Sequence, residues 1–266
     1  MDLLTRDYEF ALRLGREAIP RLREAFAGPH EITAKPGAGI VTDTDRAMEA
    51  WVRREVSLHL PGHVVLGEEE GFTAEATGPC WVVDPIDGTT NFAAGTPLFA
   101  FSLGLIQDGA PRVAVCVDPM REEIFSAAAD RGALLDGRPI RCTARELSGE
   151  SCFAMPSNGG PRLAAALARV VERAKLRNTG STVLNACYVA AGRFETCFAT
   201  NSHLWDIAAA SLIVLEAGGI VTDAEGRALF PLLQHPGRLK HQQYQFVCSA
   251  PHLHERILTE FVGKAP

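Results

Sequence analysis

The first part of the chain alternates apolar and charged positions at helical spacing, which is typical of an amphipathic helix. Gly28 and Pro29 end this helix. A second predicted helix follows, with Thr44 or Asp45 as its N-cap and Pro61-Gly62 as its stop. The apolar positions are Leu4, Tyr8, Leu12, Ile19, Leu22 and Phe26 in the first helix, and Ala47, Trp51, Val52 and Val56 in the second.

Short apolar runs bounded by turn residues predict strands after the second helix. Two of them flank residues 107–109 as a hairpin, and Asp136-Gly137 forms a later turn. From about residue 150 helices and strands alternate, and residues 230–244 form a predicted surface loop. The fold class is therefore α/β (α+β), with an α+β first half and an α/β second half. Predicted strands are 63–67, 80–83, 99–106, 112–117, 124–129, 133–135, 176–178, 194–198, 219–222 and 246–248, and predicted later helices are 161–174, 182–192, 206–217 and 251–262.

Composition is that of a globular protein. Of the 266 residues, 47% are apolar, enough to offset chain entropy and exclude disorder for most of the chain. The length fits one large domain or two small ones. A net charge of −6 argues against a nucleic-acid partner, although an acidic protein can still hold an anionic substrate if a metal ion inverts the local field.

The sequence predicts a cytoplasmic protein without a membrane segment. Its longest strongly apolar stretch, residues 207–215, is far shorter than the roughly 20 residues that a spanning helix needs. Charged residues near the start, Asp2 and Arg6 among them, break any signal-peptide pattern. The 7 cysteines are odd in number and include no C-x-x-C pair, which favours reduced thiols.

Three acidic clusters are candidates for chemistry. The first, Gly67-Glu68-Glu69-Glu70-Gly71, follows an apolar run, and its simplest interpretation is a solvated run of charge. In the third, Asp206 begins an otherwise apolar helix, where it is either an N-cap or a metal carboxylate.

The second cluster is the most informative. Asp84 and Asp87 flank Pro85 and Ile86 after an apolar strand, and a simple turn with one capping aspartate does not explain two. Such close like charges repel unless a cation lies between them, and Mg²⁺ prefers carboxylate and carbonyl oxygens. The backbone amides of residues 88–90 would then bind an anion such as phosphate.

Together the clusters resemble the signature segments of the inositol monophosphatase family, in the same order. The resemblance covers nearly the whole chain and implies the five-layered α/β/α/β/α sandwich of that family. It divides the chain into an N-terminal subdomain, residues 1–145, and a C-terminal subdomain, residues 146–266, which form one catalytic unit. The matching segments are Val41 to Asp45, Gly67-Glu68-Glu69, Asp84 to Phe92, Trp205 to Ala209 and Glu216 to Gly219.

The resemblance implies a role for each matching residue. It implies two or three Mg²⁺ ions per subunit, lithium sensitivity and a homodimer. Lys35 would lie in a loop that closes over the site. The implied metal ligands are Glu68, Asp84, the Ile86 carbonyl, Asp87 and Asp206, and the implied catalytic residues are Glu68, Thr89 and Asp45, the last two helping to deprotonate the attacking water.

The residues that would contact substrate differ from those of inositol-specific relatives. Ala199 stands where those relatives carry a glutamate, and Gly180-Ser181-Thr182 replaces G-T-A or G-S-A. Thr90 favours the inositol or fructose bisphosphate branches, because other members more often have Lys there. His203 either contacts the substrate or is a surface histidine. The expected substrate-binding residues are Gly88, Thr89, Thr90, Ser181, Thr182 and His203.

The expected reaction is Mg²⁺-dependent hydrolysis of a small phosphorylated metabolite, such as an inositol or related polyol phosphate, by water. The D-x-D-x-[TV] arrangement of aspartyl-phosphate enzymes is absent, which argues against a covalent intermediate. Histidinol phosphate, fructose 1,6-bisphosphate and nucleotide 3′-phosphates are alternative substrates. A non-catalytic relative that binds metabolites or a partner is the alternative of another class. Such a protein should lack a ligand or Thr89, and this chain lacks none.

Overall fold

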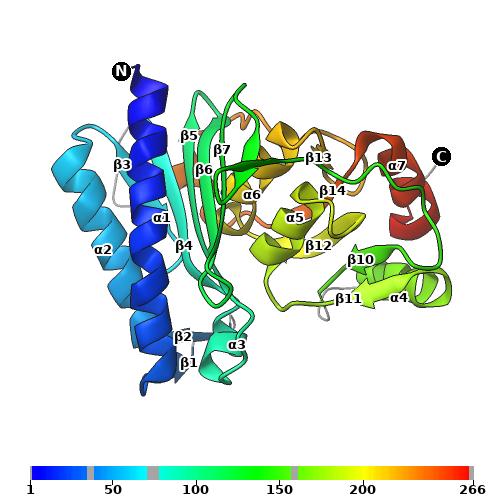
Figure 1. Cartoon of the computed structure of the whole chain (residues 1–266), viewed down its shortest axis with the longest axis horizontal. Coiled ribbons are helices and arrows are strands. Elements are labelled where there is room, and N and C mark those ends of the chain that lie inside the picture. The colour runs from blue at the N-terminus through cyan, green and yellow to red at the C-terminus, as the bar shows by residue number, and fades with distance from the viewer. Residues whose placement is uncertain (1, 35–38, 71–77, 157–160, 264–266) are drawn as a thin grey trace.

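The computed structural model describes residues 2–34, 39–70, 78–156 and 161–263 (Figure 1). Lys35 lies outside these residues. Two larger sheets and a small β1–β2 hairpin alternate with helices. The helices are α1 Leu3–Ala27, α2 Asp43–His59, α3 Thr89–Ala93, α4 Pro161–Arg173, α5 Thr182–Ala190, α6 Leu204–Glu216 and α7 Pro251–Arg256, with η1 at Pro236–Leu239 and η2 at Ile257–Val262. The strands are β1 Ile32–Ala34, β2 Ile40–Thr42, β3 Val64–Gly67, β4 Cys80–Asp87, β5 Ala100–Gln107, β6 Ala110–Asp118, β7 Glu123–Ala128, β8 Ala133–Leu135, β9 Arg138–Ile140, β10 Cys152–Ala154, β11 Lys175–Arg177, β12 Thr196–Ser202, β13 Ile220–Thr222 and β14 Tyr244–Ser249.

Helices and sheets stack in five layers, which confirms the predicted α/β/α/β/α sandwich. Helices α1 and α2 cover one face of the seven-stranded sheet β3–β9, and α5 and α6 lie between it and the five-stranded sheet (Figure 1). Helices α4 and α7 cover the outer face of the second sheet. The core between the two sheets contains side chains of both. The predicted division of the chain into two subdomains near residue 145 stays a prediction.

The first helix matches the sequence pattern, whereas the second begins earlier than predicted. Thr42, not Thr44 or Asp45, is the N-cap of α2. A reciprocal pair of contacts explains the shift: the Thr42 hydroxyl accepts from the Asp45 N–H, and the Asp45 carboxylate accepts from the Thr42 N–H. Asp45 is therefore the third residue of the helix, fully buried.

Strand β4 is longer than predicted and carries the second acidic cluster inside the sheet. It pairs in parallel with β3 and antiparallel with β5. The pairing with β5 is regular as far as Asp84, shifts register, and resumes at Asp87. This bulge turns Asp84 and Asp87 out of the regular alternation and toward one side.

The remaining departures are short strands and element ends. Strand β10 of the second sheet was not predicted, nor were β9 of the first sheet and the β1–β2 hairpin. Each has only three residues and carries little pattern, although the equally short β8, β11 and β13 were predicted. Strand β12 begins and ends later than the predicted 194–198, and pairs antiparallel with β14. The last predicted helix is α7 followed by the wider turns of η2.

Helix α6 begins before Asp206. His203 is its N-cap and Asp206 its third residue, so the N-cap interpretation of Asp206 is wrong. The Asp206 carboxylate instead accepts from the His203 N–H at 2.6 Å. The helix is buried on nearly all sides, which explains why its apolar run has no polar face.

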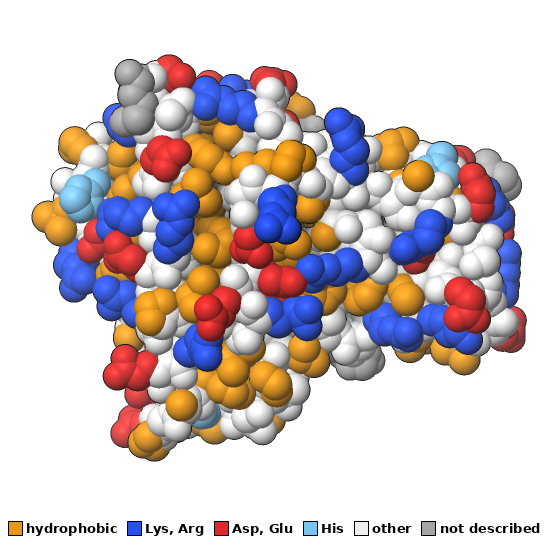
Figure 2. Space-filling view, viewed as in Figure 1, with side chains coloured by type: hydrophobic (Ala, Val, Ile, Leu, Met, Phe, Trp, Pro, Cys, Tyr) orange, Lys and Arg blue, Asp and Glu red, His pale blue; other side chains and the backbone are white. Residues whose placement is uncertain are grey.

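The surface mixes charges of both signs. Figure 2 shows Lys and Arg side chains interspersed with Asp and Glu over one face. None of the described helices is both long and apolar enough to cross a membrane.

Candidate functional site

Three carboxylates meet at one point between the two sheets. Asp84 and Asp87 come from the β4 bulge, and Asp206 comes from the first turn of α6. One oxygen of each lies within 4.8 Å of the others. Residues more than a hundred positions apart in the chain therefore form a single cluster.

Burial and mutual repulsion destabilise the ionised form of these three carboxylates when no cation is bound. Burial, then the charges of Glu68, Asp87 and Asp206, raises the pKa of Asp84 well above its usual value. Burial raises the pKa of Asp87 to about 6, although hydrogen bonds from Ser181 and Val183 oppose the shift. Burial and the charges of Asp87 and Glu68 likewise raise the pKa of Asp206. A bound cation would remove this cost.

Each acid is held by backbone or hydroxyl donors. Asp84 Oδ1 accepts from the Ile86 N–H at 3.0 Å, which orients the carboxylate within the bulge. Asp87 Oδ2 accepts from Ser181 Oγ at 2.6 Å and from the Val183 N–H at 2.6 Å. Because Ser181 is the N-cap of α5, these contacts join β4 to the start of that helix.

A hydroxyl lies between the acid cluster and a second buried carboxylate. Thr89 Oγ1 is 3.3 Å from Asp45 Oδ1 and 3.0 Å from the Ile86 carbonyl oxygen, either of which can accept its proton. The other oxygen of Asp45 accepts from the Thr42 N–H at 2.8 Å and from the Thr42 hydroxyl. The pair predicted from the sequence is thus in contact, and Thr42 is the partner that sequence reasoning missed.

Glu68 lies outside the trio but influences it. It follows β3, and its charge raises the pKa of all three aspartates. Sequence reasoning also missed Glu49, a fully buried acid on α2 that binds the backbone after Glu68. Its position, one helical turn after Asp45, was the signal that could have drawn attention to it.

The predicted phosphate-binding backbone begins in a left-handed conformation. Gly88 has φ +103°, and a Cβ there would lie 3.1 Å from the Leu98 carbonyl oxygen. A glycine is therefore required where the chain leaves β4 and enters the short helix α3. Asn91 fixes this turn, since its Nδ2 donates to the Leu98 and Thr179 carbonyls at 2.6 and 2.7 Å.

A cavity of about 580 Å³ adjoins Asp87 through Ser181. Three predicted substrate residues, Thr90, Ser181 and Thr182, line it. Gly88, Thr89 and His203 are not in its described lining. The His203 ring stacks on Trp205, with centroids 4.7 Å apart and planes at 11°, while the backbone N–H of His203 donates to the Asp206 carboxylate. Ala199 is buried on β12.

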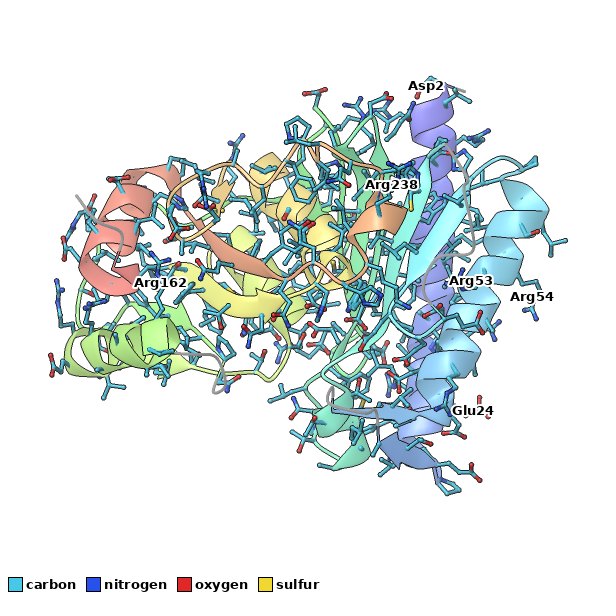
Figure 3. All side chains as sticks on the ribbon, turned by 180° about the vertical axis from the view of Figure 1, so that it is seen from behind. Asp2, Glu24, Arg53, Arg54, Arg162 and Arg238 are labelled. Atoms are coloured by element: carbon cyan, nitrogen blue, oxygen red, sulfur yellow. The ribbon has the colours of Figure 1, made fainter. Side chains whose placement is uncertain are left out.

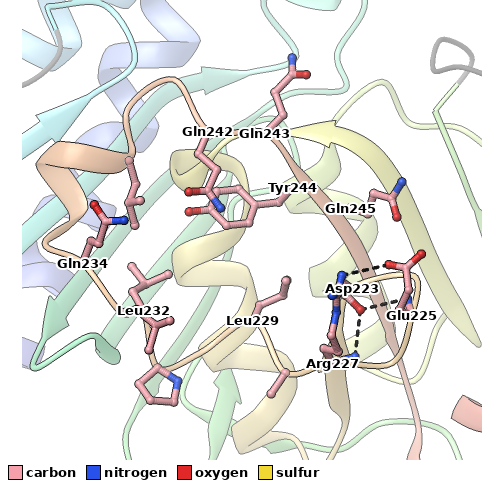
Figure 4. Close-up of a pocket in the computed structure, with 14 residues that line it drawn as sticks. Asp223, Glu225, Arg227, Leu229, Leu232, Gln234, Gln242, Gln243, Tyr244 and Gln245 are labelled. Atoms are coloured by element: carbon pink, nitrogen blue, oxygen red, sulfur yellow. Dashed lines mark hydrogen bonds and ion pairs between the residues drawn. The ribbon is translucent and has the colours of Figure 1, made fainter.

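A second cavity, of about 590 Å³, lies between the chain after β13 and the start of β14 (Figure 4). Leucine and glutamine side chains line much of it, and Arg227 pairs with Asp223 at 2.7 Å on its edge. None of the predicted site residues lines it. The acid cluster, not this cavity, is therefore the candidate centre of chemistry.

Comparison with known proteins agrees with the resemblance in the sequence. The sequence model described as the inositol monophosphatase family matches residues 3–264. Inositol monophosphatase 2 of Solanum lycopersicum is 35% identical over 233 residues, 82% of this chain and 87% of that protein. Nus factor SuhB of Escherichia coli is 38% identical over 226 residues, 81% of this chain and 84% of that protein. The solved structure of an IMPase from Thermotoga maritima superposes with a TM-score of 0.85 at 29% identity, covering 95% of each chain.

Proposed function

This chain belongs to the inositol monophosphatase family, and on that premise we propose that it is a Mg²⁺-dependent phosphatase that hydrolyses a small phosphate monoester with water as the nucleophile. The observation that carries the proposal is the cluster of Asp84, Asp87 and Asp206, whose oxygens lie within 4.8 Å of one another. An all-carboxylate donor set is the set that hard divalent cations prefer.

The residues present fit Mg²⁺. Buried acids with raised pKa values are stabilised by a cation at their centre, and Glu68 and the Ile86 carbonyl add further oxygen donors. We propose Glu68, Asp84, Ile86, Asp87 and Asp206 as the ligands of two or three ions. When bound, Mg²⁺ supplies positive charge that polarises the phosphoryl group and acidifies a nearby water.

The protein's own groups then move the proton and hold the substrate. With its hydrogen directed to Asp45, the Thr89 hydroxyl has a lone pair free to accept a proton from the attacking water. The Thr42 donors hold Asp45 in place for this transfer. We propose that the amides of residues 88–90 bind the phosphate group, and that Thr90, Ser181, Thr182 and His203 surround the rest of the substrate.

The substrate we propose is an inositol phosphate or a related sugar or polyol phosphate. The names of the tomato and Thermotoga relatives support this choice. Histidinol phosphate, fructose 1,6-bisphosphate and nucleotide 3′-phosphates are the alternatives within the family, since Ala199 removes the glutamate that contacts inositol in other members. A homodimer, lithium sensitivity and a cytoplasmic location are proposed from the family as well.

A malachite-green assay tests the proposal. Phosphate release is measured from inositol 1-phosphate, fructose 1,6-bisphosphate, histidinol phosphate and adenosine 3′,5′-bisphosphate, each with Mg²⁺ and with a chelator. We expect turnover only with Mg²⁺, and the ranking of kcat/KM identifies the substrate. Equal release in the chelator would refute the metal-dependent mechanism.

The Escherichia coli relative gives a second candidate. Its name, Nus factor SuhB, describes a role other than phosphate hydrolysis, and it is 38% identical to this chain. We propose partner binding without catalysis as the alternative function. It predicts no phosphate release from any substrate at saturating Mg²⁺, although the acids and Thr89 are all in place.

A further inference from the structure

Glu49 is a buried acid that the proposed chemistry does not use. It lies on α2 and its side chain is fully buried. Its Oε2 accepts from the Glu69 N–H at 2.8 Å, and its Oε1 accepts from the Glu70 N–H at 3.1 Å. These are the two amides that directly follow Glu68, so both carboxylate oxygens are bound to the segment that carries the proposed metal ligand.

The residue before Glu68 is seated against the same carboxylate. Gly67 is the last residue of β3 and pairs with Val83 of β4. A Cβ at Gly67 would lie 2.1 Å from Glu49 Cδ. Only glycine allows this approach, so Glu68 is held between a sheet pairing on one side and two amide contacts on the other.

Arg53 balances the charge of Glu49. Its Nε and Nη2 donate to Glu49 Oε1 at 2.9 and 2.7 Å, and its Nη1 donates to the Val65 carbonyl at 3.1 Å. The Arg53 side chain is 19% exposed, whereas that of its neighbour Arg54 is 64% exposed. In Figure 3, Arg53 lies against the sheet and Arg54 on the outer side of α2. A buried carboxylate with this many donors is fully satisfied.

We propose that Glu49 is a positioning residue, which acts through the backbone after Glu68 to hold the Glu68 carboxylate beside Asp84 and Asp87. The assignment rests on the proposed function for the role of Glu68 as a metal ligand and for the identity of the cation. Helix α2 also carries Asp45, so one rigid element sets the place of Glu68 and of the Thr89–Asp45 pair. Contacts of this kind orient a metal ligand without binding the metal. Their loss by mutation typically weakens metal affinity 10- to 100-fold.

Direct metal binding tests the role. Mn²⁺ binding to the whole protein is measured by electron paramagnetic resonance for the wild type and for Glu49→Gln, which keeps the size but loses one acceptor oxygen. We expect the Kd for Mn²⁺ to rise about tenfold. In the phosphatase assay, the half-saturating Mg²⁺ concentration should rise similarly, with the substrate KM at saturating Mg²⁺ unchanged.

Glu195 offers a matched control. It directly precedes β12, is 2% exposed, and accepts from Arg145 Nε at 2.7 Å and from the Cys152 N–H at 2.6 Å, so it too is a buried glutamate that binds an arginine and a backbone amide. Glu195→Gln should lower the melting temperature without changing the Kd for Mn²⁺. An equal loss of Mn²⁺ affinity in both variants, or none in Glu49→Gln, would overturn the proposal.

Hydrogen exchange on the wild type tests the same contacts without a variant, and so serves if Glu49→Gln fails to fold. In chelator, the amides of Glu69 and Glu70 should exchange at least tenfold more slowly than unstructured amides, and free exchange would refute the contacts. The two proposals can fail separately. If the protein hydrolyses no substrate but Glu49→Gln still weakens Mn²⁺ binding, the proposed function is refuted and the positioning role of Glu49 is supported.

Discussion

Asp87→Asn tests whether the acid cluster strains the metal-free fold. Burial raises the pKa of Asp87 from 3.8 to about 6, and each unit corresponds to about 1.4 kcal/mol. Ionised Asp87 therefore costs the metal-free protein about 3 kcal/mol at neutral pH. Asparagine has nearly the same shape, and its Oδ1 can still accept from Ser181 Oγ and the Val183 N–H, so the variant removes the charge and keeps both contacts.

The pH dependence gives the sign of this effect. The folded state holds the Asp87 proton to a higher pH than the unfolded state does, so the contribution of Asp87 to stability is fully present below pH 3.8 and is lost as the pH rises through about 6. In chelator at pH 7.5, the free energy of unfolding of Asp87→Asn should exceed that of the wild type by about 3 kcal/mol. This difference corresponds to a rise in Tm of roughly 6–12 °C. At pH 4 the difference should nearly vanish.

Urea unfolding and thermal melting in chelator, at both pH values, measure the difference. Saturating Mg²⁺ should then stabilise the wild type more than the variant, because the wild type offers the ion one more charged carboxylate. A variant that is no more stable than the wild type at pH 7.5, or one whose advantage is the same at pH 4, would refute the electrostatic reasoning.

Three further changes probe the site and the core. Asp84→Asn should abolish phosphate release while the circular dichroism spectrum stays that of the wild type, and near-normal turnover would count against the proposed ligand set. Thr89→Val should lower kcat about 100-fold with little change in KM, whereas Thr89→Ser, which keeps the hydroxyl, should recover most of the rate in the same assay. Ser211 on α6 is fully buried, and its hydroxyl has no hydrogen-bond partner among the described residues, so Ser211→Ala should leave the free energy of unfolding unchanged or raise it by up to about 1 kcal/mol. A loss of more than that would point to a partner for the hydroxyl.

The elements that the sequence predicted well are those with long, strong patterns. Helix α1 and the β5–β6 hairpin lie where the apolar spacing and the turn residues place them. Predictions failed at ends and in short pieces. The N-caps of α2 and α6 lie two or three residues earlier than the sequence suggested, because Asp45 and Asp206 reach back to the N-cap amide instead of capping the helix themselves.

The sequence by itself determined the kinds of donor and their order along the chain. Two aspartates around Pro85, a glutamate after a strand and an aspartate on an apolar helix already indicate a cation site, because the chemistry of oxygen ligands is local to each residue. The family resemblance added an expected role for each of them.

The tertiary structure alone decided which of these groups meet and what holds them. The β4 bulge and the first turn of α6 bring Asp84, Asp87 and Asp206 within 4.8 Å, and this follows from the packing of α6 between two sheets. The same packing buries Glu49 against the backbone after Glu68, a contact between residues 20 positions apart that no local pattern records. Raised pKa values arise from this convergence, because burial and repulsion depend on neighbours in space and not on neighbours in sequence.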